Sequence, residues 1–465
     1  MKNLLKPLSL ALFVAATLPT QNACNRTSPS SNPPTQNAHT QTSPPSNTLP
    51  ATSPSPHFCK AIGGPAGEAG KSLIQTSDGG YAIAGTTTSF GAGGWDVYVV
   101  KLDANGNLQW TKTIDGQASE EGNSLTQTSD GGYAITGSYD IVDGEVYTGD
   151  VYVVKLDAKG NLQWTKTIGG PGYEIGFSLI QTADGGYAIA GSTQSFGAGQ
   201  LDVYAVKLDA NGNLQWTKTI GGEGLDDGSS IIQTSDGGYA IAGSASFGAE
   251  NYEDVCVFYD VYVVKLDAKG NLQWTKTIGG PGNEIGKSLT QTSDGGYAIA
   301  GTYGLVDYEG IHPVDVYVFK LDANGNLQWT KTIGGPDSEE GNSLIQTSDG
   351  GYAIAGKTNS FGAGGYDVYV VKLDAHGNLQ WTKTIGGPSY EIGYSLIQTS
   401  DGGYAIAGYT ESFSAGETDV CIVKLDKNGN ACCAVSQTSR VGSGGTLGSP
   451  TSSIGSGGTL TNQCP

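Results

Sequence analysis

The sequence is poor in the residues on which nucleic-acid binding and most catalysis depend. It contains two arginines among 465 residues, and its net charge at pH 7 is −20. These values argue against a basic face for nucleic acid and against arginine-rich recognition of phosphate. Histidine is also scarce, and its positions in separate segments offer no Ser-His-Asp triad and no metal cluster. The four histidines are His39, His57, His312 and His376.

The apolar run at the start of the chain is too short for a mature membrane helix. It extends over Leu8–Leu18 behind two lysines, which is the pattern of a secretory signal peptide at residues 1–23. Cys24 follows where a bacterial lipoprotein carries its lipid, and ordinary cleavage without a lipid is the alternative. Residues 24–56 form a Ser/Thr/Pro-rich linker that cannot bury a core. We therefore predict an exported protein of the bacterial envelope, at the outer surface or in the periplasm, held to a membrane only through a lipid, or a secreted protein.

The cysteines that follow Cys24 show no spacing typical of a zinc site. Export permits disulfides, but the sequence does not select one pairing among these residues. They are Cys59, Cys256, Cys421, Cys432, Cys433 and Cys464. Residues 436–465 repeat a Gly/Ser phrase, and we predict a flexible tail there.

An internal repeat is the strongest feature of the chain. The phrase SLIQTSDGGYAIAG, from Ser72 to Gly85, returns six more times with small changes, and its copies are spaced 52 to 58 residues apart. The aspartates of the seven DGG phrases are Asp78, Asp130, Asp184, Asp236, Asp294, Asp349 and Asp401.

Each unit predicts four short antiparallel strands. SLIQTS turns through Asp-Gly-Gly into YAIAG, and DVYVVKLD turns through ANG or a similar phrase into NLQWTKTI. Four strands in about 50 residues without helical periodicity are typical of a β-propeller blade. We therefore predict an all-β, seven-bladed propeller over residues 57–435, and a stacked solenoid is the alternative.

The two ends of this region predict how the ring closes. Six units end in LQWTKTI, whereas the seventh ends in NACCAV, and HFCKAIGG at the front carries Phe58 in the place of the tryptophan. An N-terminal strand that completes the last blade would remove the open edge of the ring. A disulfide from Cys59 to Cys432 or Cys433 would clamp this closure. ACCAV competes for the same place, so an extra outer strand is the alternative for that segment.

QTSDGGYAIAG and DVYVVKLDANGNLQWTKTIGG are the phrases that recur most faithfully. Together they resemble the repeat of secreted and surface-attached propeller proteins of bacteria and archaea. The segment KLDANGNLQW is also similar to the quinoprotein-type repeat, whose blades carry an Asp, a Gly turn and a Trp. The resemblance covers about residues 57–435 and implies a fold rather than a function.

One face of the predicted ring collects the connections that vary most between copies, which is what a binding surface needs. On this face each unit carries an acid four residues before its SL phrase. In the structural interpretation these acids accept hydrogen bonds from backbone or serine groups, and in the functional one they attract Ca²⁺ or a basic partner. The acids are Glu68, Glu120, Glu174, Asp226, Glu284, Glu339 and Glu391, and Glu121, Asp227 and Glu340 add a second carboxylate in three units.

A second set of acids opens the third strand of each unit. Hairpin pairing predicts that Asp96 and its equivalents form cross-strand ion pairs with Lys112 and its equivalents. The repeated tryptophans are interpreted as packing between blades. The DANGN phrase lacks the further oxygen ligands of a Ca²⁺ loop, so we interpret it as a turn.

Aromatic residues interrupt the variable connections beside these acids. Rings that stack on sugar faces, with carboxylates that accept hydroxyl hydrogens, suit glycan binding, and the same surface suits a protein partner. The candidate ligand-binding residues are Trp95, Tyr173, Tyr259, Tyr366, Tyr390 and Tyr394.

Enzymatic interpretations find less support in the sequence. A sevenfold set of acids singles out no acid and nucleophile pair for glycoside hydrolysis. We therefore expect a monomeric, non-catalytic propeller that binds a surface glycan or protein, without a cofactor other than Ca²⁺ at the acidic ring. A structural or envelope-assembly scaffold is the first alternative, and a propeller hydrolase or quinoprotein-like enzyme is the second.

Overall fold

The computed structural model describes residues 57–431, with gaps at 92–93, 117, 144–145, 248–257, 281 and 308–309, and five short strands within 434–463. The predicted signal peptide, Cys24, the linker and the pair Cys432–Cys433 lie outside the described residues. No helix capable of crossing a membrane occurs in the described part of the chain.

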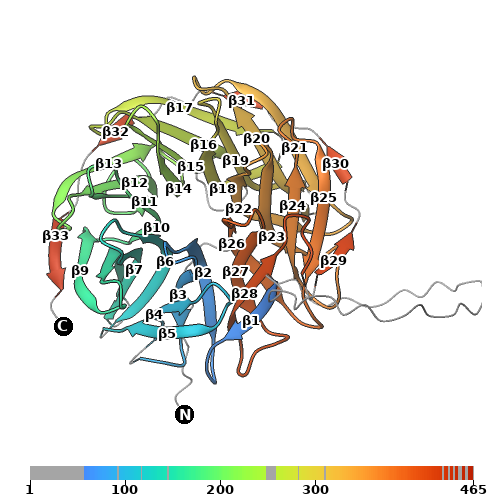
Figure 1. Ribbon diagram of the computed structural model, residues 1–465. Coiled ribbons are helices and arrows are strands. Elements are labelled where there is room, and N and C mark those ends of the chain that lie inside the picture. Colours follow the sequence, from blue (N-terminus) through green and yellow to red (C-terminus); the bar gives the residue numbers. More distant parts are fainter. Residues whose placement is uncertain are drawn as a thin grey trace, which may run out of the picture. The chain divides into compact units, whose positions relative to one another are not determined.

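The described residues form a seven-bladed β-propeller, as the sequence predicted (Figure 1). The strands nearest the centre are β2 (Glu68–Gln75), β6 (Ser119–Gln127), β10 (Glu174–Gln181), β14 (Asp226–Gln233), β18 (Gly282–Gln291), β22 (Glu339–Gln346) and β26 (Glu391–Gln398). The second strands are β3 (Tyr81–Thr87), β7 (Tyr133–Asp143), β11 (Tyr187–Thr193), β15 (Tyr239–Phe247), β19 (Tyr297–Asp307), β23 (Tyr352–Thr358) and β27 (Tyr404–Thr410).

The outer half of each blade comes from the DVYVVKLD and LQWTKTI phrases. The third strands are β4 (Asp96–Leu102), β8 (Val146–Leu156), β12 (Asp202–Leu208), β16 (Phe258–Leu266), β20 (Gly310–Leu321), β24 (Asp367–Leu373) and β28 (Asp419–Leu425). The fourth strands are β5 (Leu108–Ile114), β9 (Leu162–Gly169), β13 (Leu214–Gly221), β17 (Leu272–Gly279), β21 (Leu327–Gly334), β25 (Leu379–Ile385) and, in the seventh blade, β1 (Phe58–Ile62). The second and third strands are buried on both faces because the neighbouring blades cover them.

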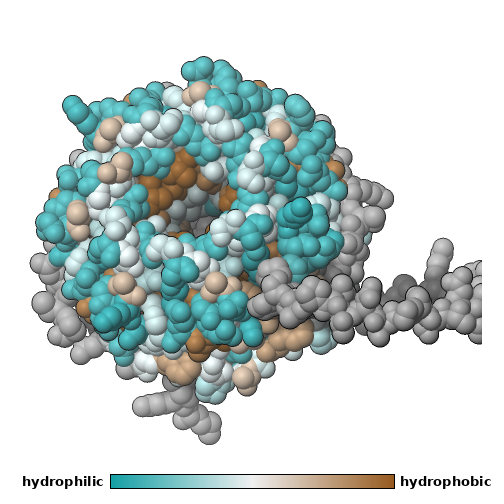
Figure 2. Space-filling model, in the orientation of Figure 1, coloured by the Kyte–Doolittle hydropathy of each residue, from teal (hydrophilic) through white to brown (hydrophobic). Residues whose placement is uncertain are grey.

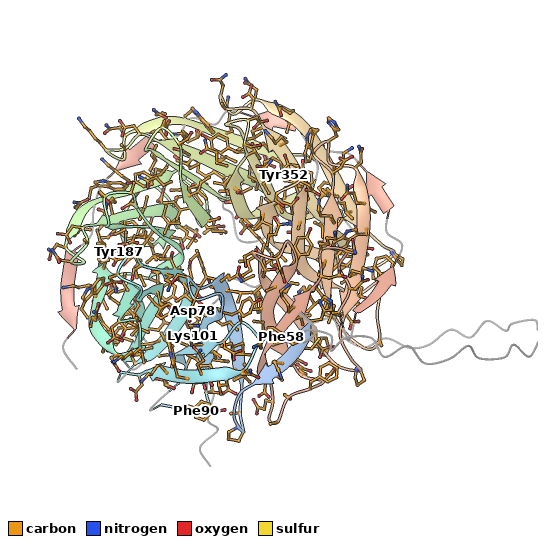
Figure 3. All side chains as sticks on the ribbon, viewed as in Figure 1. Phe58, Asp78, Phe90, Lys101, Tyr187 and Tyr352 are labelled. Carbon is orange, nitrogen blue, oxygen red and sulfur yellow. The ribbon has the colours of Figure 1, made fainter. Side chains whose placement is uncertain are left out.

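The N-terminal strand β1 closes the ring, which confirms the predicted closure. It pairs antiparallel with β28, from Phe58 opposite Lys424 to Ile62 opposite Val420. The Phe58 ring meets Tyr81 of the first blade edge to face at 5.7 Å and 72° (Figure 3). Cys59, in the same strand, takes part in a disulfide bond, whereas Cys421 is free and buried. The pairing of Cys59 with Cys432 or Cys433 stays a prediction.

The C-terminal segment differs from the flexible tail that its composition predicted. It contributes fifth strands to five blades: β29 (Ala434–Gln437), β30 (Arg440–Gly442), β31 (Thr446–Gly448), β32 (Ser453–Gly455) and β33 (Thr459–Gln463). They pair with β25, β21, β17, β13 and β9, so this segment follows the rim from the sixth blade to the second (Figure 1). An exposed outer strand offers unpaired backbone groups, and even a three-residue strand can satisfy some of them. The AV of ACCAV therefore extends the sixth blade rather than the seventh.

Adjacent blades are joined by the same three contacts around the whole ring. Each repeated tryptophan meets the tyrosine of the next YAI phrase edge to face at 5.7–5.9 Å, which agrees with its predicted role in packing between blades. The serine of each SL phrase accepts a hydrogen bond from a backbone N–H of an adjacent blade at 2.9–3.2 Å. The glutamine of each phrase accepts another, from the residue before the Asp of an adjacent DGG turn, at 2.8–2.9 Å.

The aspartate of each DGG turn forms an ion pair with a buried lysine of the third strand. In the first blade Lys101 lies 2.9 Å from Asp78 and also donates to the carbonyl oxygen of Leu102 (Figure 3). The lysine side chain is 4% exposed and the aspartate 55%. The predicted ion pair between Asp96 and Lys112 was wrong, because the register places Lys112 opposite Val99 rather than beside Asp96. The turn therefore also supplies the counterion of an otherwise isolated buried charge.

This geometry predicts an asymmetric response to mutation in the third blade. Burial by itself raises the pKa of Asp184, but hydrogen bonds from Thr182 and Lys207 outweigh this effect and lower the pKa to about 2. We expect Asp184→Ala to lower the free energy of unfolding by about 2 kcal/mol, because it leaves the buried Lys207 ammonium without a counterion. Lys207→Met should cost less than about 1 kcal/mol, since the remaining carboxylate is half exposed and is solvated by water. Urea denaturation of both variants measures the difference, and equal losses would contradict this account.

Candidate functional site

The seven junctions between blades on the variable face share one arrangement. The residue that precedes the third-strand aspartate of one blade lies against the residue that precedes the first-strand acid of the next. The Trp95 carbonyl, for example, accepts a hydrogen bond from the Glu120 N–H at 2.7 Å. The pairs are Trp95 with Ser119, Gly149 with Tyr173, Leu201 with Leu225, Tyr259 with Asn283, Val314 with Ser338, Tyr366 with Tyr390, and Thr418 with Gly67. Each junction thus carries a variable pair of residues at its surface.

A pair of buried carboxyl groups lies beneath each variable pair. Both predicted sets of acids meet there, the third-strand aspartate of one blade with the first-strand acid of the next. At the junction of the second and third blades, Asp150 and Glu174 both flank Gly169, and a side chain at that glycine would collide with them. The pairs are Asp419 with Glu68, Asp96 with Glu120, Asp150 with Glu174, Asp202 with Asp226, Asp260 with Glu284, Asp315 with Glu339, and Asp367 with Glu391.

In four blades the first-strand acid is fully supplied with hydrogen-bond donors. Glu174 accepts hydrogen bonds from the Thr193 hydroxyl at 2.7 Å, the Ser195 N–H at 3.0 Å and the Gly170 N–H at 2.7 Å. The local sequence explains this, because each such blade has Thr-x-Ser-Phe one residue after its AIAG phrase. Glu68, Glu339 and Glu391 have the same set of donors. The structural interpretation, in which the first-strand acids accept hydrogen bonds within the fold, therefore describes these four acids.

Glu120 and Glu284 depart from this arrangement. A tyrosine, Tyr139 or Tyr303, stands opposite them where those four blades have the threonine. Glu120 Oε1 and both oxygens of Glu284 are buried without a hydrogen-bond partner among the described residues. Burial, and then the charge of the adjacent aspartate, raise the pKa of both glutamates to about 7. Each of these two glutamates therefore keeps its proton to a higher pH than an ordinary carboxyl group does.

The predicted Ca²⁺ site at the acidic ring stays a prediction. Each junction brings together two repeated carboxyl groups, fewer oxygen ligands than Ca²⁺ takes. No group of three or more acid, histidine or cysteine side chains within the described ranges is arranged to hold a metal.

The second acids of the second, fourth and sixth blades each have partners. Glu121 lies 2.7 Å from Lys71 of the first blade. Asp227 accepts hydrogen bonds from Ser229 and Ser244. Glu340 is held by two lysines, as described below. These acids therefore contribute to internal networks as well as to the charge of the face.

The structure separates the predicted aromatic residues into two groups. Trp95, Tyr173 and Tyr259 lie at three different junctions, each against a non-aromatic partner: Ser119, Gly149 and Asn283. Tyr366, Tyr390 and Tyr394 come together where the sixth and seventh blades meet.

The blade 6–7 cluster, which we define as Lys357, Tyr366, Tyr390, Tyr394 and Tyr409, combines rings and charges. The Tyr366 and Tyr390 rings lie 6.1 Å apart at 43°, and Tyr390 is 45% exposed. The Lys357 ammonium lies 4.4 Å from the centre of the Tyr366 ring. The Tyr394 and Tyr409 rings are also 6.1 Å apart. This is the one junction among the described residues at which two aromatic residues form the variable pair.

Carboxylates complete the surroundings of this cluster. Glu340 accepts from Lys357 at 2.9 Å and from Lys287 at 2.7 Å. Burial by itself raises the pKa of Glu340, but the charges of Lys287 and Lys357 outweigh this effect and lower the pKa to about 2. Glu411 accepts a hydrogen bond from the Ser389 hydroxyl at 2.6 Å. The face of the molecule that is drawn in Figure 2 is mostly hydrophilic and hollowed at the centre of the ring, with apolar surface on part of the wall of the hollow.

Sequence reasoning missed Lys357 and Tyr409 as members of the cluster. A signal for both was present, because the residue after AIAG or AITG is a small Ser or Thr in the first five copies. The sixth copy has Lys357 there and the seventh has Tyr409. Two consecutive departures from a small residue mark the junction that differs from the others.

The repeats also match a known family model. The model described as outer membrane protein assembly factor BamB matches residues 68–286 and 152–392, which together span most of the propeller. The chain belongs to this family. Membership agrees with the repeated blades and their closed ring, and it leaves open which surface the protein uses.

Individual relatives are more distant. The regulatory protein FlaEY of Caulobacter vibrioides is 29% identical over 139 residues, which are 26% of this chain and 15% of that protein. An uncharacterized WD repeat-containing protein, L264, of Acanthamoeba polyphaga mimivirus is 22% identical over 434 residues, and the match covers 74% of this chain and 29% of that protein. The chain thus spans less than a third of either relative.

Solved structures resemble the chain only loosely. A puromycin hydrolase mutant is 13% identical with a TM-score of 0.45, and covers 80% of this chain and 54% of its own. The polysaccharide lyase Uly1 is 12% identical with a TM-score of 0.46, and covers 77% of this chain and 90% of its own. Neither similarity carries an argument about activity.

Proposed function

We propose that this protein is an exported, lipid-anchored, non-catalytic binding protein that recognises a surface glycan or protein through its variable face. The blade 6–7 cluster is the observation that carries the proposal. At the six other junctions the equivalent residues also lie against each other, yet this one pairs two tyrosines, Tyr366 and Tyr390, at the surface.

The chemistry of the cluster favours a glycan as the ligand. The exposed ring of Tyr390 offers an apolar face to a pyranose ring, and Glu411 beside it can accept hydroxyl hydrogens. The Lys357 ammonium supplies donors next to the Tyr366 ring. Two rings tilted by 43° form a shallow surface suited to a chain end or a flat segment of a polysaccharide.

Family membership supports a second candidate function. The family is described as an outer membrane assembly factor, and this favours a scaffold that contacts other proteins of the envelope. A scaffold needs surfaces for protein segments, so glycan binding and protein assembly predict different ligands for the same ring.

A pair of matched variants tests the glycan proposal. We expect Tyr390→Ala to weaken binding to the preferred sugar on a glycan array about tenfold, because stacking on an aromatic ring is worth about 1 kcal/mol or more. Trp95→Ala is the control, since Trp95 stands at the first junction in the place that Tyr366 has here, against the non-aromatic Ser119. Calorimetric titration with the best sugar gives the two affinities.

The outcomes separate the candidates. Equal losses from both variants would assign binding to the whole face rather than to the cluster. Wild-type protein that binds no sugar on the array would refute the glycan version and favour the envelope scaffold.

A further inference from the structure

Four of the fifth strands on the rim pair with their blades in the same register. In four blades an apolar residue of the C-terminal segment stands opposite the isoleucine of the TKTIG phrase, and the residue after it stands opposite the preceding threonine. The residue before it stands opposite the glycine of the same phrase. The apolar pairs are Leu460 with Ile168, Ile454 with Ile220, Leu447 with Ile278, and Val441 with Ile333.

The first blade has the same outer strand without a fifth strand. Within the described residues β5 pairs only with β4. Thr111 of β5 is exposed, whereas the equivalent Thr217 and Thr382 of covered strands are 6% and 3% exposed. Strand β5 therefore presents a surface that is buried in Thr217 and Thr382 of strands with a fifth strand beside them.

One residue distinguishes this open edge from the occupied ones. Asp115 follows Ile114 and is exposed, whereas glycine follows the isoleucine in the other five copies of the phrase and in the equivalent strand β1. It lies close enough to Asp96 and Glu120 for its charge to raise the pKa of both. An edge strand that ends in an uncompensated acid favours a basic residue across from it.

We propose that the outer edge of the first blade, Thr113–Ile114–Asp115, binds an extended segment of a partner protein as an antiparallel fifth strand. The register shared by the four fifth strands sets the order of that segment: a basic residue opposite Asp115, then Val, Leu or Ile opposite Ile114, then a small residue opposite Thr113. The chain contains one such tripeptide, Arg440-Val441-Gly442, which forms β30 and pairs with β21 of the fifth blade.

Among the described residues, the outer strand β1 of the seventh blade is the other one that pairs with no fifth strand, and it fits such a segment less well. Its outer strand β1 ends in Ile62 followed by Gly63, so it lacks the acid that selects a basic residue. The net charge of −20 on the whole chain would also draw a basic segment to the protein. The proposed binding edge, β5, lies on the rim of the first blade, so the inference does not depend on the blade 6–7 cluster.

A labelled peptide tests the inference on the intact protein. The probe is fluorescein-TSRVGSGG, which copies residues 438–445, and fluorescence anisotropy measures its affinity. We expect a peptide with Glu in place of Arg to bind wild-type protein at least about fivefold more weakly. Asp115→Lys should reverse this preference, and Asp115→Gly should abolish it.

The variants are chosen to keep the fold, because Gly is the residue at this position in the other five copies and in β1. Hydrogen exchange then locates the peptide, and we expect new protection over Leu108–Ile114 alone. No binding, or equal binding of both peptides by wild-type protein, would overturn the inference. Protection on β21 would show that the peptide merely replaces the chain's own strand, and dimerisation abolished by Asp115→Lys would assign the edge to a second copy.

Discussion

Replacing Gly191 by alanine is expected to lower the free energy of unfolding by about 3 kcal/mol or more. Gly191 lies in β11, in the fifth position of the YAIAG phrase, and a Cβ atom there would overlap the backbone carbonyl oxygen of Ile175 on β10. The obstacle is backbone, so no side-chain rotation relieves it. Guanidinium denaturation of the purified variant measures the loss.

The overlap arises from the shape of the inner hairpin. The register of β10 and β11 shifts between Gly176 and Ser178, which forms a β-bulge beside the glycine. Ser192→Ala, one residue away in the same buried strand, removes a hydroxyl without adding an atom and should cost less than about 1 kcal/mol. An alanine at Gly191 with an unchanged denaturation midpoint would show that the bulge can shift, and would refute this reading of the hairpin.

Replacing both Glu120 and Glu284 by glutamine is expected to stabilise the protein at pH 8 and to leave it nearly unchanged at pH 5. A carboxyl group with a raised pKa stabilises the folded state below its unfolded pKa, and this contribution is lost as the pH rises through about 7. Glutamine stays neutral throughout. We expect a gain of about 3 kcal/mol at pH 8 for the double variant, roughly half of the unscreened value, since solvent and relaxation reduce it.

Glu174→Gln is the matched control with the opposite sign. Glu174 accepts three hydrogen bonds, from Thr193, Ser195 and Gly170, so an amide NH2 group would face donors. It should therefore lower stability at both pH values. Thermal melts of the three proteins between pH 5 and 8 provide the comparison. A double variant whose stability follows the wild-type pH profile would show that Glu120 and Glu284 are not the groups that titrate.

The ring and its closure were predictable because they follow from repetition. Seven copies of one phrase fix the number of blades, and Phe58 in a strand that resembles LQWTKTI identifies the missing fourth strand of the last blade. Hydrophobic alternation and Asp-Gly turns are local signals, so one copy is enough to interpret them.

The ion pairs and the rim depend on details that local patterns do not contain. The register of β4 and β5, which shifts between Lys101 and Leu102, places the lysine chosen for Asp96 opposite Val99, three residues away. The strands of the C-terminal segment are mostly three residues long, too short for an alternating pattern to be visible. They form because an edge of matching shape is already present.

The candidate site was predictable in its members and not in their grouping. Sequence alone placed Tyr366 and Tyr390 in connections that lie 24 residues apart, and it gave the same status to Trp95, Tyr173 and Tyr259 at three other junctions. Their proximity follows from the hydrogen bond between the Glu391 N–H and the Tyr366 carbonyl, which crosses from one blade to the next. A pattern within one repeat cannot show a contact between two repeats.

The junction closed by β1 is no weaker than the other six in its geometry. The Phe58–Tyr81 contact falls within the range of the tryptophan contacts, and Ser395 accepts from Leu73 at 3.0 Å just as its equivalents do elsewhere. A blade that separates from the ring therefore loses its contacts with both neighbouring blades, whichever of the seven blades it is. Such a ring has no preferred breaking point, so its blades should unfold together in one cooperative transition rather than peel away from the point of closure.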